Sequence, residues 1–135
     1  MKPSLRRPAA LALALSVIPV PSLVLADEAS SFDHIKIKAG KALFEAECRR
    51  CHATDADDPS YGPLREGVVG RRAGSFDGYA YSDALKGAGF VWTPGALRAW
   101  MEDNDGFVPG TKMRHVGIED PTVQAFILAY LQSVS

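Results

Sequence analysis

The stretch "ECRRCHAT", residues 47–54, contains both cysteines of this chain, Cys48 and Cys51, and places His52 directly after the second. Residues three positions apart lie on the same face of a helical turn, so the two thiols can act on one partner. The next residue then carries its imidazole beside them. This octapeptide predicts a local site, and the rest of the chain decides what kind.

Three ordinary uses of paired cysteines are weak here. A disulfide between Cys48 and Cys51 closes so short a loop that it stabilises little. A redox pair normally opens a helix next to a βαβ pattern, and no alternating run of β-branched residues precedes it. Zinc would find three ligands in Cys48, Cys51 and His52, and the C-terminal half offers no second cysteine pair to complete a tetrahedron.

The remaining interpretation is C-x-x-C-H, the attachment sequence of c-type haem. The two thiols would form thioether bonds to the vinyl groups of one porphyrin. His52 would then bind the iron through one imidazole nitrogen, while a carbonyl or another acceptor fixes the second ring N–H. The motif predicts one haem c, bound covalently through Cys48 and Cys51.

The N-terminus has the pattern of an export signal. Lys2, Arg6 and Arg7 precede an apolar stretch over residues 9–26, which ends in Val24-x-Ala26, a suitable cleavage site. Pro19 and Pro21 interrupt the stretch, so it is shorter than the roughly 20 apolar residues of a spanning helix. We expect a cleaved signal peptide, residues 1–26, a mature domain, residues 27–135, without a membrane span, and a periplasmic location.

The charge balance argues against nucleic acid as a partner. The whole chain has 15 basic and 16 acidic residues, and three of the basic ones fall within residues 1–26. A mature chain with an acidic excess lacks the basic footprint that nucleic-acid binding needs.

A second protein ligand for iron is best sought in "FVPGTKMRH", residues 107–115, where Pro109 and Gly110 predict a loop. Met113 has few packing reasons to be there, and Met/His ligation raises the reduction potential in cytochromes c. His115 is a weaker competitor. Met101 is expected in the core, because Thr93 and Pro94 predict a helix start and place it on an apolar stripe. His34 is expected to be solvated, before the first helix.

Two longer helices are predicted at the ends of the mature domain. Residues 35–51 place Ile37, Gly40, Phe44, Cys48 and Cys51 at helical spacing. Asp120 can cap and Pro121 can start the second helix. Its inner stripe comprises Val123, Phe126, Ile127, Tyr130, Leu131 and Val134. Glycines and prolines divide the middle of the chain, so no sheet is expected.

Seven segments occur in a familiar order: "CRRCH", "YGP", "GVVGRRAG", "GYAYSDALKGAGFVWT", "LRAWME", "VPGTKM" and "ILAYLQ". With them the chain, from Gly40 onward, resembles the class I c-type cytochromes, the group of mitochondrial cytochrome c and small bacterial cytochromes. The resemblance implies an all-α fold of short helices and loops wrapped around one haem. It also implies crossing terminal helices that meet through Gly40, Phe44, Ile127 and Tyr130.

The resemblance assigns roles at further positions. Pro63 would accept the N–H of His52, and Thr111 would order the loop before Met113. Trp100 would pack near the methionine sulfur. A haem propionate would be held by Arg71, Tyr81 and Trp92. The chain departs from the family at Arg65, which occupies an apolar site. Further departures are Leu85 in place of asparagine, Trp100 in place of tyrosine, and His115 in place of an aromatic residue.

The function predicted from all this is one-electron carriage in the periplasm, with no substrate transformed by the chain alone. Its partners would be redox proteins that dock transiently on a monomer. Two alternatives stay open: a haem domain dedicated to one dehydrogenase, and a ligand-binding or peroxidase-like haem protein. Acidic and basic residues mix around the motif, so the sequence assigns no sign to a docking surface.

Overall fold

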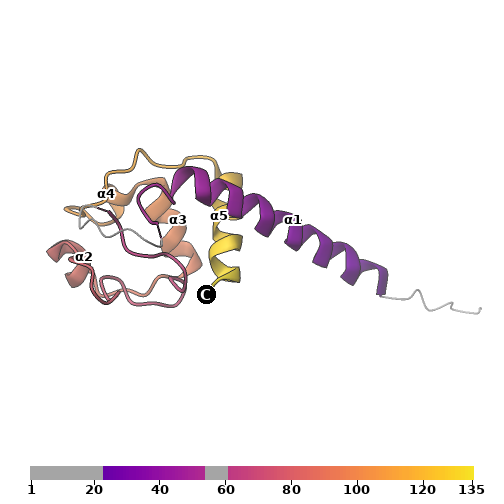
Figure 1. Cartoon of the computed structure of the whole chain (residues 1–135), viewed down its shortest axis with the longest axis horizontal. Helices are drawn as coiled ribbons and strands as arrows, with labels where there is room; N and C mark the ends of the chain where they lie inside the picture. The colour runs from indigo at the N-terminus through magenta and orange to yellow at the C-terminus, as the bar shows by residue number, and fades with distance from the viewer. Residues whose placement is uncertain (1–22, 54–60) are drawn as a thin grey trace, which may run out of the picture.

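A computed structural model of the chain describes residues 23–53 and 61–135. Five helices occur in these ranges, α1 (Leu23–Glu47), α2 (Asp83–Gly87), α3 (Pro94–Glu102), α4 (Asn104–Phe107) and α5 (Pro121–Ser133). Loops connect them, and the shorter helices gather around one end of α1 (Figure 1). Within the described ranges the β-structure is a single bridge between Arg72 and Val91. The predicted all-α architecture without a sheet is confirmed for the described residues.

Helix α1 is longer than the sequence pattern indicated. It begins at Leu23, so it includes His34, which we expected before the helix; that side chain is exposed, as predicted. No proline and no glycine before Gly40 interrupts the segment, which explains the early start. Figure 1 shows the first turns of α1 extending away from the rest of the molecule. Of the predicted signal peptide, residues 1–22 lie outside the described residues.

The crossing of α1 and α5 holds the two ends of the domain together. At Gly40 a Cβ atom would lie 1.8 Å from the backbone oxygen of Phe126, so only glycine allows this approach. One turn further along α1, the Phe44 ring packs against Tyr130 with 5.3 Å between ring centroids. Ile127 is fully buried. The predicted contact between the terminal helices is therefore confirmed.

The helix starts follow local side-chain chemistry. The Asp120 carboxylate accepts hydrogen bonds from the backbone N–H groups of Thr122 and Val123, at 2.7 and 3.4 Å, and caps α5. Thr93 caps α3 by accepting from the Ala96 N–H at 3.1 Å. Both caps were predicted from the sequence, and each satisfies a backbone donor that has no partner within its helix.

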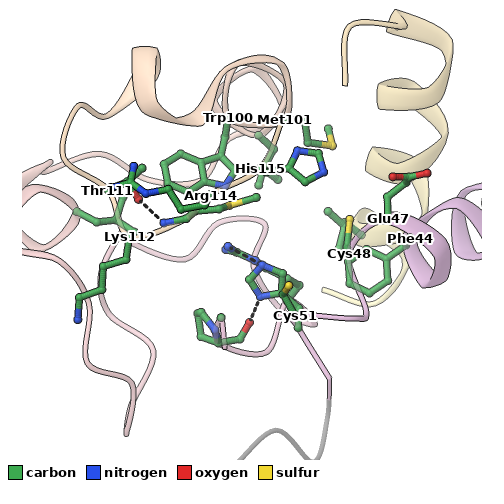
Figure 2. Close-up of a pocket in the computed structure, with 18 of the residues that line it drawn as sticks. Phe44, Glu47, Cys48, Cys51, Trp100, Met101, Thr111, Lys112, Arg114 and His115 are labelled. Carbon is green, nitrogen blue, oxygen red and sulfur yellow. Dashed lines mark hydrogen bonds between the residues drawn. The ribbon is translucent and has the colours of Figure 1, made fainter. Parts of the chain in front are cut away.

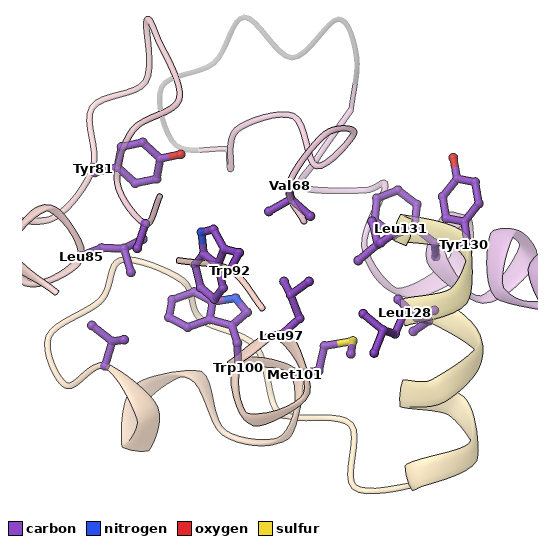
Figure 3. Packing of buried hydrophobic residues seen from close by; sticks show 14 residues of the cluster. Val68, Tyr81, Leu85, Trp92, Leu97, Trp100, Met101, Leu128, Tyr130 and Leu131 are labelled. Atoms are coloured by element: carbon purple, nitrogen blue, oxygen red, sulfur yellow. The ribbon is translucent and has the colours of Figure 1, made fainter. Parts of the chain in front are cut away.

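The hydrophobic core lies where α3 and α5 face the loop segments (Figure 3). Val68 and Trp92 from the loops pack with Leu97 and Trp100 of α3 and Leu128 of α5. The rings of Trp92 and Trp100 meet edge to face at 5.2 Å. The sequence stripe on α5 missed Leu128 and the buried Gln124, whose amide donates to the Ile118 carbonyl at 2.6 Å. One side of this core faces a cavity.

No helix in the described part of the chain has the length and apolar character needed to cross a membrane.

Candidate functional site

A cavity of about 280 Å³ separates the end of α1 from the loop that follows α4. Cys48 and Cys51 lie on one side of it, and Trp100, Thr111 and His115 lie on the other (Figure 2). Most of its surface is apolar, and α3 and α5 contribute Leu97, Met101, Ile127 and Leu131. The cavity is thus a mainly apolar space with sulfur and nitrogen atoms at its edges.

The cysteine wall is a tight turn that continues α1. The backbone N–H groups of Cys51 and His52 both donate to the Cys48 carbonyl, at 3.1 and 2.9 Å. Both thiols are free, with Cys48 half-buried and Cys51 exposed. Burial raises the pKa of the Cys48 thiol to about 11. The turn therefore presents two unpaired thiols along one edge of the cavity.

His52 is held in one tautomer. Its Nδ1 lies 2.8 Å from the Pro63 carbonyl oxygen, and because a carbonyl can only accept, Nδ1 carries the proton. Nε2 consequently keeps its lone pair. Burial, followed by the positive charge of Arg65, lowers the pKa of His52 to about 3. A neutral imidazole with a free lone pair at Nε2 is the form that binds metal.

Gly62 makes this arrangement possible. A Cβ atom there would lie 1.9 Å from Cε1 of His52, and the Gly62 N–H donates to the Cys51 carbonyl at 2.8 Å. Sequence reasoning named Pro63 and passed over this glycine. The "YGP" motif could have indicated it, because a glycine next to Pro63, the predicted hydrogen-bond acceptor of His52, often marks a place where another group approaches the backbone closely.

The opposite wall is the loop that contains Met113. The Met113 N–H reaches the hydroxyl of the buried Thr111 at 3.4 Å. Asn104, at the start of α4, donates to the Met113 carbonyl at 2.8 Å. Lys112 Nζ donates to the Ala80 carbonyl at 2.6 Å. Sequence reasoning found neither contact, because Asn104 meets Met113 at no regular helical or turn spacing and Lys112 reaches a carbonyl 32 residues away in the chain.

The structure gathers most of the predicted site residues around the cavity. Its lining includes Cys48, Cys51, His52, Pro63, Tyr81, Trp100, Thr111 and Met113. Arg71 and Trp92 are not part of this lining. The Arg71 guanidinium donates to the Leu64 carbonyl at 3.0 Å and stacks on Phe76, and Trp92 is buried between Phe90 and Trp100. Their predicted role toward a propionate stays a prediction.

Arg65 is the unexpected member of the lining. It is 8% exposed, and its Nη2 lies 3.4 Å from Nε2 of His52. Its neighbour Glu66 turns the other way and accepts a 2.6 Å hydrogen bond from Arg49, which also donates to the His52 carbonyl at 3.0 Å. The departure from the apolar pattern at position 65 therefore places a cation inside the site.

The cavity suits a haem on chemical grounds. One edge offers two thiols for thioether bonds and an imidazole lone pair, and the other offers a thioether sulfur on an ordered loop. The walls are mainly apolar, as a porphyrin face requires. The indole Nε1 of Trp100 is buried without a hydrogen-bond partner in the described part of the chain, so the lining also contains an unsatisfied donor.

Comparison with known proteins agrees with this chemistry. The family described as Cytochrome c matches residues 37–135. Cytochrome c from Euglena viridis is 40% identical over 95 residues, which cover 70% of this chain and 93% of that protein. Cytochrome c2 from Rhodopila globiformis is 43% identical over 95 residues, covering 70% and 90%.

A solved structure shows the same architecture. Cytochrome cH from Methylobacterium extorquens superposes with a TM-score of 0.65 at 43% sequence identity, covering 72% of this chain and 97% of that one. The chain therefore belongs to the cytochrome c family of electron-carrying haem proteins, and its cofactor is one haem c bound covalently through Cys48 and Cys51.

Proposed function

We propose that this protein is a periplasmic one-electron carrier whose haem iron is held by His52 and Met113. The observation that carries the proposal is the tautomer of His52, because its hydrogen bond to Pro63 leaves the lone pair on Nε2 of a residue that lines the cavity. The haem supplies the redox couple, in which iron alternates between the ferric and ferrous states. The chain's own residues attach it, exclude water from it and set its potential.

Met113 is the proposed second ligand because the loop presents it to the cavity and holds it from both sides. The Thr111 hydroxyl accepts a hydrogen bond from the Met113 N–H, and Asn104 donates one to the Met113 carbonyl. The backbone from which the thioether side chain extends is therefore held in place. A thioether favours ferrous iron and gives a high potential. If His52 and Met113 both bind the iron, no position on it would remain open for a substrate, and the chain would transform none by itself.

The location and partners belong to the same proposal. Residues 1–26 would export the chain and be removed, and the mature protein would act as a monomer that docks briefly with redox proteins. The half-exposed haem-attachment turn supports contact with partners, since Cys51 is exposed and Cys48 is half-buried. Electron transfer needs only a brief approach between the haem edge and a partner.

Three measurements on the exported protein test the proposal. Denaturing mass spectrometry should show the mass of residues 27–135 plus one haem. Absorption spectra of the oxidised and reduced forms should include the weak far-red band of a ferric centre with a thioether ligand. Osmotic shock should release the protein with the periplasmic fraction.

Each alternative predicts a different result. A ligand-binding or peroxidase-like haem protein would bind carbon monoxide rapidly in the reduced form under mild conditions and would lack the far-red band. A domain dedicated to one dehydrogenase would co-purify with an oxidoreductase subunit. Either result would replace the diffusible carrier.

A further inference from the structure

Arg65 is a buried cation without an anion in the described part of the chain. Its side chain lines the cavity, and no carboxylate of the described residues lies within ion-pair distance. The neighbouring Glu66 is engaged by Arg49 at 2.6 Å. A buried guanidinium without an anion is costly, because desolvation of a charge amounts to several kcal/mol, about the stability of a small domain. Such a residue indicates a negatively charged ligand.

The present partner of Arg65 is the same atom that iron needs. Its Nη2 lies 3.4 Å from Nε2 of His52, the nitrogen whose lone pair faces the cavity. One lone pair can face a guanidinium N–H or bind the iron, and it cannot do both. When His52 binds iron, Arg65 must therefore find another acceptor.

The groups around Arg65 indicate where that acceptor lies. From the attachment turn, Cys48 and His52 face the guanidinium, and from the loops Arg71, Tyr79 and Tyr81 do so. Burial raises the pKa of Tyr81, and the positive charge of Arg65 opposes that shift. Tyr79 and Tyr81 also line the cavity, whereas Arg71 does not. These neighbours are a thiol, an imidazole, a guanidinium and two phenols, so none of them is a carboxylate that could pair with Arg65.

We propose that Arg65 is a cofactor-binding residue that pairs with a carboxylate of the haem, on the Tyr81 side of the cavity. It supplies the cationic contact that the resemblance assigned to Arg71, whose guanidinium is already bound to the Leu64 carbonyl and stacked on Phe76. The inference rests on the proposed function, since it assumes a haem whose iron is bound by His52. A cation beside the haem disfavours the ferric state, so Arg65 also raises the reduction potential.

The test compares the midpoint potentials of haem-loaded variants between pH 5 and pH 8. Arg65→Leu should fold, because leucine suits an apolar wall, and its potential should fall below that of the wild type. The unpaired haem carboxylate would then have a raised pKa, so the potential should gain a pH dependence in this range, decreasing as the pH rises. Arg65→Lys should keep most of the potential and a flat profile.

Two further variants show whether the potential depends on a positive charge at position 65 or on any positive charge of the protein. Arg98→Met removes an exposed positive charge of α3 and should leave the potential unchanged. Arg71→Met should lower the potential less than Arg65→Leu. A wild-type potential and a flat profile for Arg65→Leu, or a larger fall for Arg71→Met, would overturn the proposal.

A structure of the haem-loaded wild type provides a second test that needs no variant. Arg65 nitrogen atoms within hydrogen-bond distance of a haem carboxylate would support the pairing, and a guanidinium turned elsewhere would refute it. The mass and the far-red band of the wild-type protein test the proposed function independently of the role of Arg65. If both are present while Arg65→Leu behaves as wild type, only the role of Arg65 fails.

Discussion

At the scale of single residues, the loop that presents Met113 also brings His115 to the cavity. His115 Nδ1 accepts a hydrogen bond from the Gly117 N–H at 3.1 Å, so its ring is already engaged by the backbone, whereas the Met113 sulfur has no hydrogen-bond partner among the described residues. This difference favours the thioether over the imidazole as the iron ligand. The sequence analysis also placed Met113 ahead of His115.

Replacement of Met113 by alanine therefore opens the iron and removes the ligand that favours ferrous iron. We expect the far-red band to disappear, the reduced form to bind carbon monoxide, and the potential to fall by about 0.1 V or more, within the range of about 0.8 V that axial ligands span. Spectroelectrochemistry measures all three. The matched variant His115→Ala should keep the band. If the band survives in Met113→Ala and is lost in His115→Ala, the ligand assignment is wrong.

At the scale of elements, the angle and distance between α1 and α5 depend on one glycine. Gly40→Ala places a Cβ against the backbone oxygen of Phe126, which cannot move away without shifting α5. We expect a loss of about 1–3 kcal/mol, the usual cost of overpacking, and a melting temperature lower by several degrees. Gly87→Ala is the control, because nothing lies within 4 Å of its Cβ position. Equal melting temperatures for the two variants would contradict the close contact.

An ion pair between Arg49 and Glu66 joins the turn after α1 to the loop after Pro63. Burial raises the pKa of Glu66 and is the largest single influence on it, but the hydrogen bond and positive charge of Arg49, together with backbone hydrogen bonds, lower the pKa overall. A carboxylate with a lowered pKa stabilises the fold above its unfolded value of about 4.3, and that contribution is lost as the pH falls through the folded value.

The prediction is that Glu66→Gln lowers the free energy of unfolding at pH 7 by about 0.5–1 kcal/mol, a modest amount because both side chains are partly exposed. The difference from the wild type should shrink as the pH falls below about 4. Urea unfolding at several pH values measures it. Glu45→Gln, which removes the longer and more exposed contact to Arg49, should have a smaller effect. A deficit that is independent of pH would show that the charge is not responsible.

At the scale of the whole molecule, the sequence predicted what local rules control. The C-x-x-C-H turn, the caps of α3 and α5, the Met113 loop and the glycine contact at Gly40 each depend on residues close together in the chain or on a known spacing. The sequence did not predict the start of α1, because no proline or glycine between Leu23 and Gly40 marks where the helix begins. It also did not predict that Arg65 enters the cavity while Arg71 turns away. Those directions depend on packing between distant segments.

The cavity also sets how stable the chain is without its cofactor. Without its occupant, the mainly apolar cavity of about 280 Å³ leaves core side chains such as Leu97 and Leu131 poorly packed, which is a serious loss for a small domain of marginal stability. The haem is therefore a large part of the core as well as the redox centre. Folding and cofactor attachment should be coupled, as they are in small metal-dependent domains.

The double variant Cys48→Ser/Cys51→Ser, prepared free of haem, should consequently lose most of its helical signal and unfold without a cooperative transition. Circular dichroism during a thermal or urea titration measures both properties. Arg50→Ser, on the same turn, leaves both thiols in place and should retain the haem, the helicity and a cooperative transition. If the haem-free double variant melts cooperatively with the helicity of the loaded protein, the polypeptide alone closes its core, and the porphyrin contributes redox chemistry without being needed for the fold.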